Sequence, residues 1–469
     1  LKKHIFEISG QLASQGIMPS NRAAIVLPNG PEMATAFLSI SSYMSAAPLN
    51  PSYKLKEYEF YLQDLMPKIV IVEKDSQNPA VEAAKNLGIE ICEIKKIDNA
   101  PSGIFNLYNK TANFEIATEN NEALVLHTSG TTSRPKVVPL TNKNIFSSAT
   151  NISNSLQLSS QDHCYNIMPL FHIHGLIAVL SSSIHAGASV YASSGFNALK
   201  FLETANKETI TWYSGVPTMH QAILMRAKKN PKLAEELNLR FIRSSSASLP
   251  PAVFDELKKI FKTTVIEAYG MTEATHQMTS NPMPPEKQKA GFVGKPAGPE
   301  VCIMDSQGNK LNTGEDGEVC IRGDNVTNGY ENNEEANKTA FINGWFRTGD
   351  QGHFDDEGYL KISGRLKEII NRGGEKVSPL EVDNILMEHE AVEQVVTFAV
   401  KDNLLGEAIG VAIVLKSGID CKEIDIKNYA SKHLADFKIP KYIRFLEEIP
   451  KGATGKLQRI GLAEKLGLE

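Results

Sequence analysis

Short apolar runs alternate with longer stretches of helical periodicity up to about residue 300. The apolar runs predict buried strands at residues 23–27, 69–72, 123–126, 241–243 and 265–267. Between them, segments such as 31–44 and 251–261 have the spacing of helices with one apolar face. Because strands and helices take turns along the chain, we predict an α/β fold with mostly parallel sheets.

The pattern changes after about residue 300. Segments 301–305, 317–322 and 359–362 predict short strands separated by turns of Gly, Asn and Asp, as in a β-rich subdomain. Beyond Gly364, the remaining stretch has the size and pattern of a compact α+β unit. We therefore predict a large N-terminal domain over residues 1–363, a hinge at 364–367 and a small C-terminal domain over 368–469.

The composition limits the class of protein. The 469 residues are too many for one compact core. Apolar residues make up 42% and charged residues 22%, as in ordinary globular proteins. The net charge of −5 gives no general attraction for nucleic acid, and no apolar run reaches the roughly 18 residues of a membrane span. We expect small-molecule partners, no nucleic acid and no membrane span, in a monomer or homodimer.

The five cysteines are scattered and form no Cys-x-x-Cys pair. This pattern favours reduced thiols over a disulfide framework or a zinc site. No signal peptide opens the sequence, and residues 467–469 do not form a peroxisomal signal. We expect a cytoplasmic protein, although the absence of an initiator Met leaves a preceding segment open.

Residues 128–136, Thr-Ser-Gly-Thr-Thr-Ser-Arg-Pro-Lys, follow a predicted buried strand. Backbone N–H groups, hydroxyls and one cation can together surround a polyphosphate. The segment lacks the GxxxxGK[ST] pattern of a Walker A loop. Its composition alone fits a polar surface loop equally well.

This segment resembles the phosphate loop of the adenylate-forming superfamily, which contains acyl-CoA ligases, luciferases and peptide-synthetase adenylation domains. The resemblance covers nearly the whole chain, and the motifs occur in the family's order. The family usually has glycine where Ser133 and Val137 stand. The resemblance implies ATP contacts from Thr128, Ser129, Gly130, Thr131, Thr132 and Lys136.

The motif Tyr-Gly-Met-Thr-Glu at 269–273 is the second point of resemblance. It implies that the Tyr269 ring stacks on adenine and that Thr272 and Glu273 act on ATP, with Glu273 as a ligand of Mg²⁺, which prefers oxygen donors. A helix N-terminus with an acidic first turn is the alternative interpretation. The same resemblance assigns further residues to the nucleotide site, namely Ser246, Ala247, Glu267 and Ala268.

Two further motifs precede the small domain. Asp350, in Gly-Trp-Phe-Arg-Thr-Gly-Asp, matches the carboxylate that binds the ribose hydroxyls in the family. Arg365 matches an arginine that contacts the nucleotide, and Lys367 stands at the hinge position. A turn aspartate and a charged interdomain linker are the alternatives.

The predicted small domain carries the last two motifs. Gly373 and Gly374 match a loop that lets backbone approach the pantetheine arm of CoA. Lys456 matches the lysine that bridges the acid carboxylate and the α-phosphate during adenylation. An ordinary Gly-Gly turn and a solvated basic surface are the alternatives.

Polar residues occupy segments that should line the acid pocket. Ser246 and His276, with His172, are candidates to bind a charged substrate group, because unpaired buried polar groups cost about 1–3 kcal/mol each. Arg243 is a weaker candidate, since its position also suits a structural role. The run from 271 to 282 resembles that of oxalate–CoA ligases.

The resemblance implies a ligase that uses ATP, Mg²⁺ and coenzyme A. It would convert a carboxylate into its acyl-adenylate and then pass the acyl group to the CoA thiol, with oxalate as the favoured acid. It also implies that the small domain is mobile. Three alternatives stay open: a ligase for another short or medium acid, an enzyme that loads a carrier protein, and an inactive nucleotide-binding scaffold.

Overall fold

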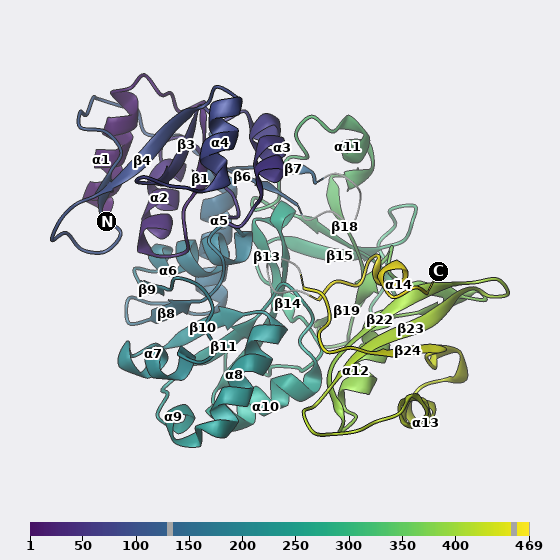
Figure 1. Ribbon diagram of the computed structural model, residues 1–469. Helices are drawn as coiled ribbons and strands as arrows, with labels where there is room; N and C mark the ends of the chain where they lie inside the picture. The colour runs from purple at the N-terminus through teal and green to yellow at the C-terminus, as the bar shows by residue number, and fades with distance from the viewer. Residues whose placement is uncertain (129–134, 452–456, 469) are drawn as a thin grey trace.

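The first predicted strands assemble into a mixed sheet with the order β5-β4-β3-β1-β2-β6-β7. The computed structural model describes residues 1–128, 135–451 and 457–468 (Figure 1). Its strands are β1 (Arg22–Val26), β2 (Ser45–Pro48), β3 (Ile69–Glu73), β4 (Glu90–Lys96), β5 (Phe105–Asn106), β6 (Glu122–His127) and β7 (Val137–Thr141). The inner pairs are parallel, and β5 and β7 run antiparallel at the edges.

The second sheet has the order β14-β13-β12-β11-β10-β8-β9. Its parallel part is β8 (His163–Asn166), β9 (Ser189–Ala192), β10 (Trp212–Gly215), β11 (Phe241–Ser244) and β12 (Thr264–Met271). The antiparallel strands β13 (His276–Ser280) and β14 (Lys295–Pro296) extend it past β12. The switch to antiparallel pairing places β13 directly beside the Tyr-Gly-Met-Thr-Glu motif.

Helices pack around and between these two sheets. Their bounds are α1 (Lys2–Ala13), α2 (Pro31–Ser41), α3 (Leu55–Leu65), α4 (Pro79–Asn86), α5 (Asn142–Ser155), the π-helix η1 (His174–Ser181), α6 (Ser182–His185), α7 (Phe201–Lys207), α8 (Pro217–Lys229), α9 (Pro231–Glu235) and α10 (Pro251–Phe261). One continuous apolar core joins both sheets, and it includes Ile25 and Leu124 from the first, Phe241 from the second and Leu176 from η1. The α/β prediction is confirmed, although the helix expected over 31–44 ends at Ser41, before β2.

A third sheet follows, and it confirms the β-rich character expected after residue 300. Its order is β15-β16-β18-β17, with β19 paired to β18. The elements are β15 (Glu300–Met304), β16 (Gly317–Arg322), α11 (Glu334–Ala340), β17 (Phe341–Ile342), β18 (Trp345–Phe354) and β19 (Leu360–Arg365).

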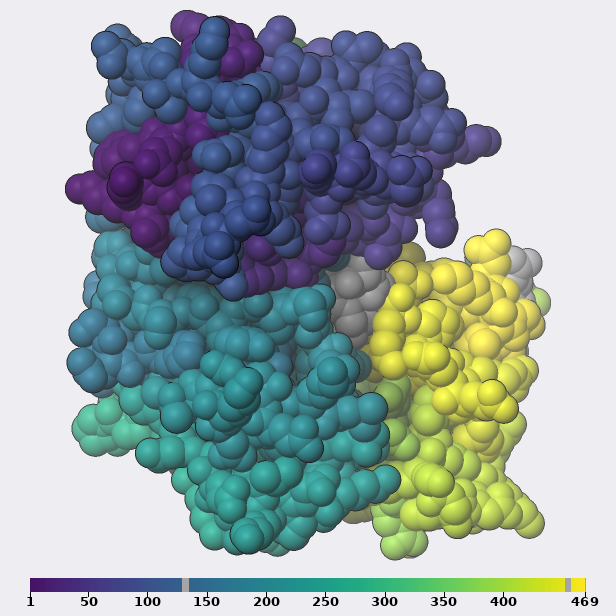
Figure 2. Space-filling view, turned by 60° about the vertical axis from the view of Figure 1, so that its left-hand side comes forward, coloured from purple at the N-terminus to yellow at the C-terminus, as the bar shows by residue number. Residues whose placement is uncertain are grey.

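The last part of the chain forms a fourth sheet with its own apolar core, which includes Ile370, Val382, Ile409 and Ile426. Its elements are β20 (Ile370–Arg372), β21 (Glu375–Val377), α12 (Pro379–Met387), β22 (Val392–Asp402), β23 (Gly406–Leu415), α13 (Glu423–His433), β24 (Tyr442–Phe445) and α14 (Leu462–Lys465). Figure 2 shows this part, coloured green-yellow to yellow, beside the large part. In the described residues no helix is both long and apolar enough to cross a membrane.

Candidate active site

Three of the predicted motifs lie at the carboxyl ends of parallel strands. Thr128 follows β6, Ser245 follows β11, and residues 269–271 end β12. Because parallel strands end at the same edge of a sheet, the loops after β10, β11 and β12 meet there. This edge is where ligands bind in open α/β sheets.

The two ends of the predicted phosphate loop, Thr128 and Lys136, are joined by a backbone hydrogen bond. The Thr128 N–H donates to the Lys136 carbonyl at 2.9 Å, which completes the β6–β7 pairing. The Lys136 ammonium lies 4.3 Å from the centre of the Tyr330 ring, a cation–π distance. Ser129, Gly130, Thr131 and Thr132 lie outside the described residues.

Glu273 is almost fully buried, with 6% of its surface exposed, in the short helix η2 (Thr272–Ala274) that also contains Thr272. The Tyr330 hydroxyl donates to its Oε1 at 2.8 Å. Burial raises the pKa of Glu273, while this hydrogen bond and the cations Arg365 and Lys136 lower it. Tyr330 therefore links the phosphate-loop lysine to the carboxylate.

The sequence reasoning missed Tyr330. It follows Gly329 in an irregular segment after β16 and has no periodic neighbours that would mark it. The structure holds this segment beside η2 through the Thr327 N–H, which donates to the Glu273 carbonyl at 2.7 Å. Such a long-range backbone contact leaves no local signal in the sequence.

Three predicted nucleotide residues come together from separate motifs. The Tyr269 hydroxyl donates to the Asp350 carboxylate, and Arg365 Nε lies 3.3 Å from Asp350 Oδ1. Asp350 and Arg365 are paired across β18 and β19. Burial, together with the charge of Asp350, raises the pKa of Tyr269 well above its usual value. An aromatic ring, a carboxylate and a guanidinium thus converge where the resemblance expects adenine and ribose.

Glu267, a further predicted nucleotide residue, is buried at the end of the parallel part of β12. Its Oε1 accepts the Leu249 N–H at 2.8 Å, and burial raises its pKa to about 8. The neighbouring Ala268 accepts a hydrogen bond from Ser245 through its carbonyl, at 2.8 Å. Both contacts hold the loop after β11, which carries Ser246 and the exposed Ala247.

Ser246 and His276 meet around a third residue, His174. Nδ1 of His174 lies 3.0 Å from Ser246 Oγ, and the rings of His174 and His276 are 4.9 Å apart between centres. His276 is 1% exposed and has a left-handed φ of 91°. Its carbonyl packs so closely on Gly270 that a Cβ there would lie 1.9 Å away, which explains the glycine at that position.

His172, the other predicted acid-binding residue, lies two residues before η1. Its Nδ1 accepts the backbone N–H of His174 at 3.3 Å. The sequence reasoning selected His172 for the acid pocket and passed over His174. His174 is the first residue of the π-helix η1, a geometry that is frequent at functional sites.

The residues predicted for the thiol step lie on the surface of the C-terminal part. Gly373 and Gly374 form the exposed turn between β20 and β21, with left-handed φ of 61° and 96°. Lys367 is exposed in the turn after β19. Lys456 lies outside the described residues.

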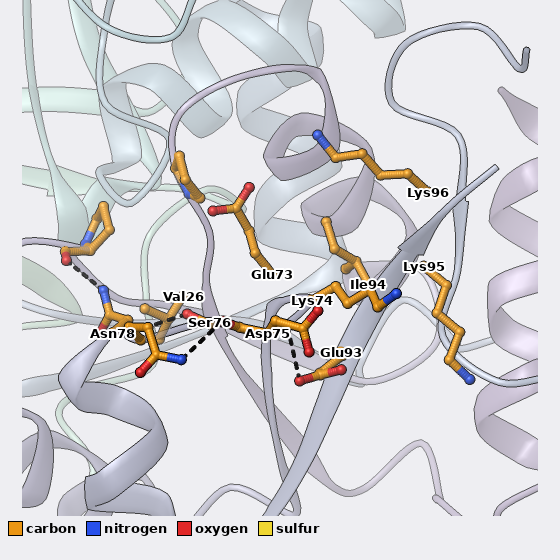
Figure 3. Close-up of a pocket in the computed structure, with 13 residues that line it drawn as sticks. Val26, Glu73, Lys74, Asp75, Ser76, Asn78, Glu93, Ile94, Lys95 and Lys96 are labelled. Carbon is orange, nitrogen blue, oxygen red and sulfur yellow. Dashed lines mark hydrogen bonds between the residues drawn. The ribbon is translucent and has the colours of Figure 1, made fainter. Parts of the chain in front are cut away.

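A separate pocket of about 910 Å³ opens at the carboxyl ends of β1, β3 and β4 (Figure 3). Charged side chains of both signs line it, among them Lys74, Asp75, Glu93 and Lys95. It contains none of the predicted site residues. Within the described part of the chain, no group of three or more His, Cys, Asp or Glu side chains could hold a metal ion.

Comparisons with known proteins agree with this geometry. Residues 1–331 match the AMP-binding enzyme family model, and residues 381–456 match the model of the AMP-binding enzyme C-terminal domain. The chain is 46% identical to an oxalate–CoA ligase of Arabidopsis thaliana, over 96% of this chain and 89% of that protein. It is 42% identical to an oxalate–CoA ligase of Saccharomyces cerevisiae, over 96% of this chain and 87% of that protein.

A solved structure gives the same result for the fold. The chain superposes on ATP-bound MatB from Rhodopseudomonas palustris with a TM-score of 0.89 and 26% identity, over 98% of this chain and 92% of that one. The arrangement of a large part and a small C-terminal part is therefore shared with a structure that holds ATP.

Proposed function

The chain belongs to the AMP-binding enzyme family and is an ATP-dependent acid–CoA ligase, and from this premise we propose that its acid substrate is oxalate. The observation that carries the proposal is the polar character of the residues that we expect to line the acid pocket. Ser246 is half-buried, whereas Arg243, His174 and His276 are almost completely inaccessible to solvent. Burying such groups is costly unless they are paired, so the site suits an acid that brings charge of its own.

The reaction requires two transfers. A carboxylate oxygen attacks the α-phosphate of ATP, pyrophosphate leaves, and the product is the acyl-adenylate. The thiol sulfur of CoA then attacks the acyl carbon, and AMP leaves with the bonding electron pair. Charge accumulates on the phosphates in the first step, so catalysis depends on cations and hydrogen-bond donors placed around them.

We assign the nucleotide to the cluster of Tyr269, Asp350 and Arg365. The Asp350 carboxylate can accept hydrogen bonds from both ribose hydroxyls, in exchange for the one it receives from Tyr269. The phosphates would extend toward Lys136 and the predicted loop residues. Lys456 would bridge the acid and the α-phosphate during adenylation.

Glu273 is our candidate for the Mg²⁺ ligand. Mg²⁺ prefers oxygen donors and usually keeps several waters, so one carboxylate together with phosphate oxygens is a suitable donor set. The nearby cations Lys136 and Arg365 favour the ionised form of Glu273, which is the form that binds a metal. When bound, the ion would neutralise part of the phosphate charge.

We propose that residues 1–363 and 368–469 move relative to each other about Lys367. The separate core of the C-terminal sheet supports this division. The turn at Gly373 and Gly374 would then approach CoA in the thiol step. In the described residues the five cysteines are free thiols, which supports a reducing, cytoplasmic location.

The test is a screen of acids with purified enzyme, ATP and Mg²⁺, in which pyrophosphate release and acyl-CoA formation are measured with and without CoA. We expect oxalate to exceed acetate, malonate and medium-chain fatty acids in kcat/KM, by up to ~10⁴-fold over acetate, because a site built to bind a polar group rejects analogues that lack it. A preference for apolar acids would contradict the oxalate proposal and leave the ligase activity standing.

A further inference from the structure

Arg243 is a buried cation without an acidic partner in the described residues. Its side chain is 0% exposed, and burial lowers its pKa to about 9, so it is still positively charged at neutral pH. Its polar neighbours are all neutral groups or imidazole, namely Ser214, His174 and Gln277. Buried arginines are normally paired with a carboxylate, so this one creates an uncompensated positive charge in the fold.

The position of Arg243 follows from strand register. Arg243 on β11 lies opposite Ser214 on the neighbouring parallel strand β10, so both side chains point to the same face. Nη1 of Arg243 lies 3.3 Å from Ser214 Oγ and 3.5 Å from His174 Nε2. The contact between Ser214 and His174 is shorter, because Ser214 Oγ and His174 Nε2 are only 2.7 Å apart.

The chemistry of these groups determines where the hydrogens lie. A guanidinium can only donate, so Ser214 accepts from Arg243 and gives its own hydrogen to His174 Nε2. A proton on Nε2 would point toward the guanidinium, and a doubly protonated ring would place two cations side by side. Both arrangements are electrostatically unfavourable in a buried site. This arrangement favours the tautomer of His174 that carries its proton on Nδ1.

Ser246 stands at the far end of this chain of hydrogen bonds. The His174 Nδ1–H donates to Ser246 Oγ at 3.0 Å, which leaves the Ser246 hydroxyl hydrogen for another acceptor. Ser246 is the most exposed of these residues, at the carboxyl edge of the sheet. It has a left-handed φ of 73°, a strained conformation for a serine, which is typical of residues held for a functional purpose.

We propose that Arg243 is a positioning residue that sets the selectivity of the enzyme for a dianionic acid. Through Ser214 and His174 it orients Ser246 as a hydrogen-bond donor toward the second carboxylate of the substrate, and its unpaired charge favours a substrate with that extra negative charge. Arg243 need not touch the acid to do this. The inference rests on the proposed oxalate function and names the group that decides between a dicarboxylate and a monocarboxylate.

The test removes the Ser214 hydroxyl in one variant and keeps a hydroxyl at that position in another. Ser214→Ala interrupts the series of hydrogen bonds from Arg243 to Ser246 without removing a charge. We expect the ratio of kcat/KM for oxalate to that for acetate to fall roughly 10-fold or more, since the buried Arg243 N–H loses its acceptor. The KM for ATP should stay within about twofold. Ser214→Thr keeps the hydroxyl and should restore the selectivity. Ser39→Ala removes a similarly buried hydroxyl from α2 and serves as the matched control.

A second pair of variants tests the proton position. His174→Asn can keep an N–H near the Nδ1 position and should retain more selectivity than His174→Gln, whose amide reaches toward the Nε2 position. Thermal melts of all variants separate selectivity from folding. Wild-type selectivity in Ser214→Ala, or an equal loss in Ser214→Ala and Ser214→Thr, would overturn the inference. A wild type that does not use oxalate would instead contradict the proposed substrate.

Discussion

The proposed nucleotide side of the site, around Asp350 and Glu273, and its proposed acid side, around Arg243, differ in how their charges are balanced. On the nucleotide side, Asp350 faces Arg365, and Glu273 accepts a hydrogen bond from Tyr330. On the acid side, the hydrogen-bond partners of Arg243 among the described residues are neutral groups and imidazole. In the first region each of these carboxylates has a cation or a hydrogen-bond donor beside it, and we expect these partners to be exchanged when ATP binds. The second region has an excess of positive charge that an anion would neutralise.

This difference suggests how binding and selectivity are divided. Adenine nucleotide binding is the property for which the AMP-binding enzyme family is named, so a prearranged and internally paired site would be sufficient for it. The acid varies among relatives, and an unbalanced buried charge discriminates strongly, because the wrong substrate leaves it unpaired. Changes on one side should therefore affect one substrate and spare the other.

The largest effect is expected from Lys456→Ala. Loss of a charge-stabilising donor at the α-phosphate should reduce adenylation by ~10²–10³-fold. The thiol step, measured from supplied oxalyl-adenylate and CoA, should be largely retained. Lys451→Ala is a control from the same basic segment, because Lys451 pairs with Glu448. Normal adenylate formation in Lys456→Ala would remove the residue from the proposed chemistry.

His276→Ala should have the next largest effect and should act on the acid side alone. Loss of a buried polar contact of about 1–3 kcal/mol corresponds to a fall in oxalate kcat/KM of roughly 5- to 150-fold. The KM for ATP should not change. The measurement is steady-state kinetics beside a thermal melt, because His276 also packs against Gly270 in the β12–β13 bulge. A melt that drops while selectivity is kept would assign His276 a structural role.

The fold was more predictable from the sequence than the site was. Alternating apolar runs and helical segments identified five of the parallel strands, β1, β3, β6, β11 and β12, because this periodicity reports directly which faces are buried. The parallel strands β2, β4, β8, β9 and β10 were not predicted. The motifs identified Tyr269, Asp350 and Arg365, which the structure places in contact. Each of these residues stands in a local pattern that can be read without knowing its neighbours in space.

The residues that were missed depend on long-range pairing. Ser214 meets Arg243 only through the register of β10 and β11, and it meets His174 across 40 positions of the chain. Tyr330 reaches Glu273 from 57 positions away. Strand register and loop placement are decided by the packing of the whole core, so no short segment of sequence carries that information.

Tyr330→Phe should have the smallest effect of the three variants, and it tests the difference between the two sides most directly, because it removes one oxygen from the nucleotide side. The ring stays in place, so the contact with Lys136 is kept while the hydrogen bond to Glu273 is lost. That hydrogen bond lowers the pKa of Glu273 against the effect of burial, so its removal raises the pKa further. If adenylation needs the ionised carboxylate, activity is lost as the pH falls through this pKa, and the acidic limb of the pH profile should move to higher pH in Tyr330→Phe.

At neutral pH we expect about a 5- to 10-fold weaker apparent affinity for ATP with Mg²⁺, equivalent to one lost hydrogen bond of about 1–1.5 kcal/mol. The ratio of kcat/KM for oxalate to that for acetate should equal that of the wild type, because the acid side is untouched. Tyr359→Phe, a second buried tyrosine whose hydroxyl donates to the Lys287 carbonyl, controls for the loss of a buried hydroxyl in general. An unchanged acidic limb in Tyr330→Phe would show that Glu273 is not the group that titrates, and a change in acid selectivity would show that the two sides are coupled after all.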